Sequence, residues 1–202
     1  MPYRFRYVAD IDLEDFNELS DAKLLVIIGH SEYWTRRARE HFDRFVLEGG
    51  NALILSGNTT RWRVRDSDDQ TQLICYTECP DPIQDPLLKT VNWTDGLLRY
   101  PIVPSIGADF PRGGYGIDYP DKGWNGFRVL VLESPVFRGV SVGRGDIIAM
   151  PSVEYDGAPL FDRPVTDGEP RLDPDALGED RAELIGYDMI SLFVNRQPVF
   201  VA

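Results

Sequence analysis

Apolar and polar positions divide residues 24–58 into a strand, a helix and a second strand. The continuous apolar run LLVII, residues 24–28, is typical of a strand buried on both faces of a parallel sheet. Residues 52–55 predict the next strand, which ends at Ser56-Gly57-Asn58. Because the connections are short, we expect the two strands to be parallel neighbours joined by a helical crossover.

The segment between the two strands predicts a helix. Thr35 is a suitable N-cap residue, and Gly49-Gly50 ends the segment. The apolar positions of its inner face follow helical spacing: Ala38, Phe42, Phe45 and Val46. His41 is expected on the solvent side of this helix.

The rest of the chain has weaker patterns. A short helix is expected at residues 12–19, and strands are expected at 3–8, 71–77, 127–132, 146–153 and 199–202. Glycine and proline make residues 107–126 a long loop or insertion, and residues 158–178 are expected to be irregular. The whole pattern predicts a single α/β domain over residues 1–202 with a largely parallel sheet and one irregular insertion. Both ends fall on predicted strands, so we expect a larger parent domain that has been truncated at both ends.

The charge balance limits the partners. The 202 residues include 21 basic and 33 acidic side chains, a net charge of −12. This argues against nucleic acid or an anionic membrane as the main partner, because both are bound by basic patches. There is no apolar run long enough to span a membrane, no secretory signal pattern, and no disulfide framework, with cysteines only at Cys75 and Cys79. We therefore expect a cytoplasmic protein.

Polar and aromatic residues gather where the predicted strands end. His30-Ser31-Glu32-Tyr33 follow the first strand, residues 58–62 the second, Tyr76 and Glu78 a third, and residues 152–156 a fourth. Ligands of open α/β sheets bind beyond the carboxyl ends of the strands, so these groups would share a crevice if their strands are neighbours. Tyrosine, tryptophan and glutamate at strand ends also commonly serve only packing and hydrogen bonding.

Motifs of several common enzyme classes are absent. The sequence contains no G-x-S-x-G, P-loop, G-x-G-x-x-G or H-E-x-x-H pattern. Cys75 and Cys79 have no second spaced pair, so incidental thiols are favoured over a zinc site. His30 remains as a candidate base or hydrogen-bond donor beside a ligand.

Several stretches match a known family in order. GHSEYW is followed by a helix, by GGN, and by GN and WRVR; LICYTE, PSVEYDG and YDMISLFVNRQPVFVA come later. This pattern resembles the N,N-dimethylformamidase large-subunit (beta-subunit) family over nearly the whole chain. The catalytic domain of that family resembles class I glutamine amidotransferases, which implies a flavodoxin-like sheet.

The resemblance implies a mononuclear iron site, with one Fe3+ per chain held by two tyrosinates and one glutamate. Matched motif by motif, the ligands would be Tyr33 in HSEYW, Tyr76 in ICYTE and Glu154 in SVEYD. Tyr155 is a rival for either tyrosine role. Asn58 would be a polar partner near the metal.

These residues suit amide hydrolysis. Fe3+ prefers anionic oxygen ligands, and a bound cation stabilises the phenolate form of tyrosine. The metal can activate both a water molecule and an amide carbonyl. His30, Glu32 or the neighbours of Glu154 could move the proton to the leaving amine, and Asn58 could donate to the oxyanion. We therefore expect an amide hydrolase with a small amide substrate, which forms a homo-oligomer or binds a small companion subunit.

Two other functions remain open. One is a non-catalytic, amidotransferase-like domain that binds a small ligand through aromatic residues at Tyr115, Tyr119 and Trp124. The other is a subunit whose site is completed by a second chain. Metal analysis of the purified protein would separate the iron hydrolase from the ligand-binding domain.

Overall fold

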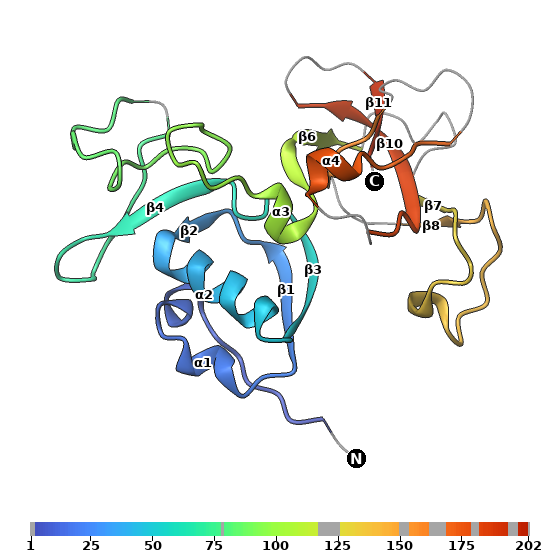
Figure 1. The fold of residues 1–202 in the computed structure, drawn as a ribbon, viewed down its shortest axis with the longest axis horizontal. Helices are drawn as coiled ribbons and strands as arrows, with labels where there is room; N and C mark the ends of the chain where they lie inside the picture. The colour runs from blue at the N-terminus through green and yellow to red at the C-terminus, as the bar shows by residue number, and fades with distance from the viewer. Residues whose placement is uncertain are drawn as a thin grey trace. The chain divides into compact units, whose positions relative to one another are not determined.

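The chain divides into two compact units, residues 1–101 and 102–202 (Figure 1). The computed structural model describes residues 3–77, 79–116, 126–149, 154–161, 169–178, 182–193 and 198–201. Whether both units work as the single catalytic domain expected from the sequence stays a prediction. No helix among these residues is long and apolar enough to cross a membrane.

The first unit contains the predicted strand–helix–strand segment. Its elements are η1 (Asp10–Glu14), α1 (Asn17–Ser20), β1 (Leu24–His30), β2 (Tyr33–Thr35), α2 (Arg36–Leu47), β3 (Asn51–Gly57), β4 (Trp62–Asp66) and β5 (Leu73–Ile74). β1 and β3 are parallel neighbours, in register from Leu24↔Asn51 to His30↔Gly57. The hydroxyl of Thr35 caps α2 by accepting from the backbone N–H of Ala38 at 3.1 Å. These local predictions are confirmed.

The expectation that β1 is buried on both faces is wrong. In the part of the chain that the structure describes, β1 and β3 form a sheet of two strands. Val26 and Ile28 are 42% and 73% exposed, and Leu53 and Leu55 beside them are 45% and 50% exposed. An apolar run shows that a strand can be buried, but not which elements cover it.

The chain does not pass directly from β1 into the helix. It bends at Ser31-Glu32 and continues as β2, which pairs in parallel with β4. Backbone bonds from Thr60 to Ser31 and from Trp62 to Glu32, both 2.8 Å, carry the pairing across the bend. β5 adds to the other edge of β4 in the antiparallel direction.

Arg39 connects helix α2 by hydrogen bonds to residues 100–101, which end the first unit. The guanidinium of Arg39, which is fully buried, lies 4.6 Å from the ring centre of Trp93 and 3.9 Å from that of Tyr100. It donates to the carbonyl oxygens of Tyr100 and Pro101. His41 is not on the solvent side as expected: its Nδ1 lies 2.8 Å from the carbonyl oxygen of Leu13.

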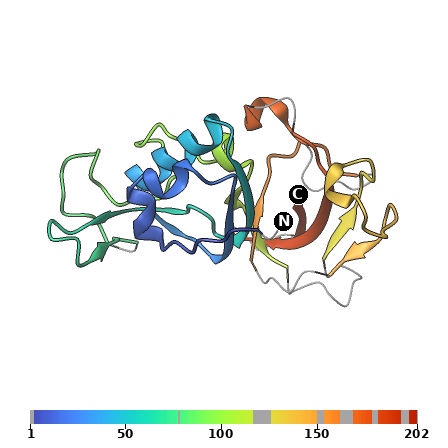
Figure 2. The ribbon, with the colours of Figure 1, turned by 90° about the horizontal axis from the view of Figure 1, so that it is seen from below.

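The second unit is built on an antiparallel sheet (Figure 2). Its described elements are α3 (Val103–Ile106), β6 (Asp109–Tyr115), β7 (Phe127–Val129), η3 (Pro135–Phe137), β8 (Ile147–Ile148), β9 (Glu154–Gly157), α4 (Pro174–Leu177), β10 (Gly186–Leu192) and β11 (Pro198–Val201). The strand order is β8-β7-β10-β6-β9, and β11 also pairs with β10. Three apolar clusters form the core of this unit, centred on Leu130, on Ile190 and on Val103.

The predicted largely parallel, flavodoxin-like sheet of the class I glutamine amidotransferase type is therefore wrong. Among the described residues, parallel pairing is limited to β1–β3 and β2–β4, and every strand pair described in the second unit is antiparallel. The expected loop at residues 107–126 contains β6. At Gly113 and Gly114 a Cβ atom would lie 1.7 Å from the Tyr155 carbonyl oxygen and 2.0 Å from that of Ser191. These glycines allow close strand pairing, a role that glycine content alone does not distinguish from a loop.

Other elements expected from the sequence are absent or shorter in the structure. Residues 3–8 form no strand, and residues 71–77 contribute only β5. The region expected to be irregular contains α4 and an isolated bridge between Leu160 and Leu172. Part of the strand expected at 146–153 lies outside the described residues.

Candidate active site

The bend between β1 and β2 brings three predicted site residues together. Nε2 of His30 donates to Oε2 of Glu32 at 2.8 Å, and the hydroxyl of Tyr33 donates to the same carboxylate. Nε of Arg61 lies 4.0 Å from the other oxygen of Glu32. The Glu32 side chain is 11% exposed and that of His30 is 53% exposed, so the group runs from the interior to solvent.

The surroundings of Tyr33 favour the neutral phenol. Burial raises its pKa, and the charge of Glu32 and the hydrogen bond to Glu32 raise it further. At physiological pH the hydroxyl therefore keeps its proton, which Glu32 accepts as a hydrogen bond. Only a cation at the phenol oxygen would reverse this preference.

A strained turn lies against the bend. Asn58 has a φ of +58° and Thr60 a φ of +54°, and both are buried. Asparagine tolerates this left-handed conformation, whereas a β-branched threonine rarely adopts it. The backbone N–H of Thr60 donates to the carbonyl oxygen of Ser31. This hydrogen bond places the turn that contains Asn58 next to the bend at Ser31 and Glu32. Strain of this kind is concentrated at functional sites.

Cys75 is a neighbour that the sequence interpretation did not include in the site. It is half-buried, and burial followed by the charges of Glu32 and Asp81 raises its pKa. The thiol also acts on the pKa of Tyr33, so the two side chains are close. A thiol held in the neutral form is a poor nucleophile. In the sequence, the one signal that Cys75 lies near the site was its position next to Tyr76.

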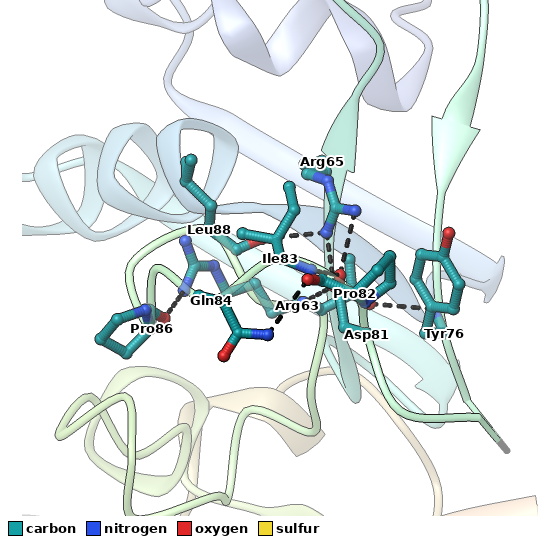
Figure 3. A network of polar contacts seen from close by, with 10 residues as sticks. Arg63, Arg65, Tyr76, Asp81, Pro82, Ile83, Gln84, Pro86 and Leu88 are labelled. Carbon is teal, nitrogen blue, oxygen red and sulfur yellow. Dashed lines mark hydrogen bonds and ion pairs between the residues drawn. The ribbon is translucent and has the colours of Figure 1, made fainter.

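Tyr76 lies where the chain leaves the edge of β4. Its backbone N–H donates to the hydroxyl oxygen of Thr90 at 2.9 Å, and its half-buried ring centre is 5.7 Å from the guanidinium of Arg65 (Figure 3). Glu78 lies outside the described residues.

Glu154 and Tyr155 begin β9 in the second unit. Glu154 is half-buried and pairs with Tyr115 of β6. Tyr155 is buried and donates to Asp188, which is 1% exposed; burial and then the charge of Asp188 raise the pKa of Tyr155 to about 12. This partner gives Tyr155 a structural role and weakens it as the rival ligand.

The donor types fit a hard cation. The exposed fraction of Tyr33 is 38%, and Tyr76 and Glu154 are half-buried, so all three keep access to solvent. Phenolate and carboxylate oxygens are the donors that Fe3+ prefers. The described residues contain no group of three or more His, Cys, Asp or Glu side chains that could hold a metal ion. A site with two tyrosine ligands and one glutamate is not a group of that kind. The proposed ligand set of Tyr33, Tyr76 and Glu154 stays a prediction.

A cavity of about 390 Å³ adjoins Tyr33. Trp34, Leu13 and Ala38 contribute apolar surface to it, and Asp10 contributes a carboxylate. A larger and more open hollow in the second unit, bordered by Leu130, contains none of the predicted site residues. We therefore regard the cavity at Tyr33 as the relevant one.

The aromatic loop proposed for ligand binding is described only in part. The ring of Tyr115 packs against Phe110 and Phe193, at centroid distances of 5.9 and 6.3 Å. Tyr119 and Trp124 lie outside the described residues.

The comparisons with known proteins agree with the resemblance seen in the motifs. A family model described as "N,N-dimethylformamidase beta subunit-like, C-terminal" matches residues 1–176. No curated protein matches the chain. The matched region includes Tyr33, Tyr76 and Glu154. The chain therefore belongs to the N,N-dimethylformamidase beta subunit-like, C-terminal family.

Proposed function

We propose that this chain hydrolyses small linear amides and holds one Fe3+ through Tyr33, Tyr76 and Glu154. The observation that carries the proposal is the hydrogen-bonded group of His30, Glu32 and Tyr33 beside a cavity of small-molecule size, in a chain of this family. When bound, the iron would polarise the amide carbonyl and lower the pKa of a water molecule.

The residues around Tyr33 are suited to moving a proton. The Tyr33 hydroxyl must lose its proton to act as a ligand, and the carboxylate of Glu32 already accepts from it. Nε2 of His30 is hydrogen-bonded to the same carboxylate, and the ring is half-exposed. In the tautomer that carries its hydrogen on Nδ1, Nε2 would accept the proton from Glu32 and Nδ1 would release one to solvent. In the reaction the same pair would carry a proton to the departing amine.

The cavity suits an uncharged substrate with short alkyl groups. A tertiary amide has no N–H, so recognition depends on its carbonyl oxygen and its shape. Trp34, Leu13 and Ala38 offer apolar surface for the alkyl groups. Asn58, in the turn that is hydrogen-bonded to Ser31, would donate to the oxygen that gains charge in the transition state.

An amidase assay tests the proposal. Iron-loaded protein should release an acid and an amine from N,N-dimethylformamide or from a related simple amide. Glu32→Gln and His30→Gln should each lower kcat at least about 100-fold, since proton transfer contributes 100-fold or more. Glu183→Gln is the matched control, because Glu183 is exposed and does not line the cavity at Tyr33. Full activity in both variants, or no activity on any simple amide with iron bound, would contradict the proposal.

The proposed partners follow from the family and the charge. The family description names a beta subunit, so the chain would assemble with a companion chain or with copies of itself. The net charge of −12 opposes binding to nucleic acid. Light scattering should give a mass above one chain, and a DNA column at about 150 mM salt should not retain the protein.

A further inference from the structure

The segment that pairs with one edge of β4 changes near Tyr76. β5 pairs with β4 only through Ile74↔Arg65 and Leu73↔Asp66. Beyond this point residues 91–93 take over the same edge, through backbone bonds from Arg63 to Val91 and from Trp93 to Arg61. The backbone N–H of Tyr76 instead donates to the side chain of Thr90.

Thr90 passes this connection to a buried carboxylate. The Thr90 hydroxyl donates to Oδ2 of Asp81 at 3.0 Å, and its backbone N–H donates to the same oxygen at 2.8 Å. Thr90 is 2% exposed and the Asp81 side chain is 3% exposed. Oδ1 of Asp81 accepts from the backbone N–H of Ile83 at 3.0 Å. The carboxylate therefore joins the loop that follows Tyr76 to the residue that holds the Tyr76 backbone.

Arg65 completes the network from the other side. Both terminal nitrogens of its guanidinium donate to Asp81, and one also donates to the carbonyl oxygen of Leu88 (Figure 3). Burial alone would raise the pKa of Asp81, but the hydrogen bonds from Arg65 and Thr90 hold it far below its usual range. The same guanidinium lies 5.7 Å from the ring centre of Tyr76. The Tyr76 backbone and ring thus both contact one charged network.

We infer that Asp81 is a positioning residue for Tyr76, acting through Thr90 at the backbone and through Arg65 at the ring. Its effect on the metal rests on the proposed function, in which the phenol oxygen of Tyr76 is an iron ligand. Groups that contact a metal ligand directly typically change metal affinity 10- to 100-fold when they are altered. Thr90 and Arg65 make these direct contacts to Tyr76, and Asp81 is bonded to both of them.

Variants at two positions test the inference. Asp81→Asn removes the charge, and Thr90→Val removes the hydroxyl while keeping the shape. Thr90→Ser keeps the hydroxyl, and Asp85→Asn makes the matched change at an exposed aspartate whose carboxylate accepts from Leu87 rather than from the network. We expect Asp81→Asn and Thr90→Val to weaken iron binding at least 10-fold in competition with a chelator, while the two controls stay within 2-fold of wild type.

A second readout does not need the metal. In protein labelled with ¹³C-tyrosine, the ring signal of Tyr76 is assigned by its loss in Tyr76→Phe. This signal should shift or broaden in Thr90→Val and stay in place in Thr90→Ser. An unchanged Tyr76 signal in folded Thr90→Val overturns the positioning role, and a changed signal with wild-type iron affinity overturns its link to the metal. If the wild-type chain binds no iron, the proposed function fails and the ring signal alone decides whether Asp81 and Thr90 position Tyr76.

Discussion

Replacing Tyr155 by phenylalanine separates a structural tyrosine from a ligand. The tyrosine ring packs edge-on against Phe127, with 5.7 Å between the ring centres, and contacts the cluster that contains Ile190. Tyr155→Phe keeps these contacts and removes only the hydroxyl that donates to Asp188. Asp188 then keeps its two backbone donors, Gly126 and Met189.

The size of the effect follows from the lost hydrogen bond. A hydrogen bond to a charged group contributes about 1.5–3 kcal/mol, so Tyr155→Phe should lower the free energy of unfolding by this amount at pH 8. Burial and then the charge of Asp188 raise the pKa of Tyr155 to about 12. This shift opposes ionisation of the phenol in the folded protein.

The pH dependence gives a sharper test. The folded protein favours the neutral phenol, so the stabilisation by Tyr155 is complete below pH 10.0 and is lost as the pH rises through about 12. The other tyrosines titrate in both proteins, so the difference between wild type and Tyr155→Phe isolates this group. Urea denaturation followed by circular dichroism should show the difference shrinking by more than half between pH 9 and 12. A difference that stays constant over this range, or a loss of bound iron in Tyr155→Phe, would refute the reasoning.

Three further predictions concern the first unit. Thr35→Ala removes the cap that accepts from Ala38 and should cost about 1 kcal/mol in urea denaturation, whereas Thr35→Ser should cost much less. Glu32→Gln removes a charge that raises the pKa of Tyr33, so ultraviolet titration, with Tyr33→Phe as the reference, should show that pKa closer to its ordinary value. Arg39→Lys loses the planar fork that spans two carbonyl oxygens and should lower the free energy of unfolding by about 2–4 kcal/mol; a loss under about 0.5 kcal/mol would contradict the packing described.

Local signals in the sequence predicted the strand–helix–strand segment of the first unit. The LLVII run, the cap at Thr35 and the helical spacing of Phe42 and Phe45 all act within a few residues, and they correctly predicted β1, α2 and β3. β10 was missed because its inward-facing residues include Asp188, whose burial depends on distant partners, Tyr155 and Gly126. Such long-range pairing leaves no periodic pattern in the sequence.

The candidate site shows the same division. His30, Glu32 and Tyr33 lie within four residues of one another, so a single bend brings them together. The approach of Cys75 depends on how β5 pairs with β4, which the sequence did not show. The motifs assigned Tyr76 as a ligand and left Tyr155 as its rival, and only the hydrogen bond of Tyr155 to Asp188 in the folded chain weakens that rival.

Iron content tests the central claim most directly. The full chain, purified and loaded with Fe3+, should hold one iron per chain and show a visible absorption band from phenolate bound to iron. Tyr33→Phe and Tyr76→Phe should each lose the band and most of the iron while their circular dichroism stays that of wild type. Absence of iron from the loaded wild-type protein, or full retention of iron and band in both variants, would contradict the account.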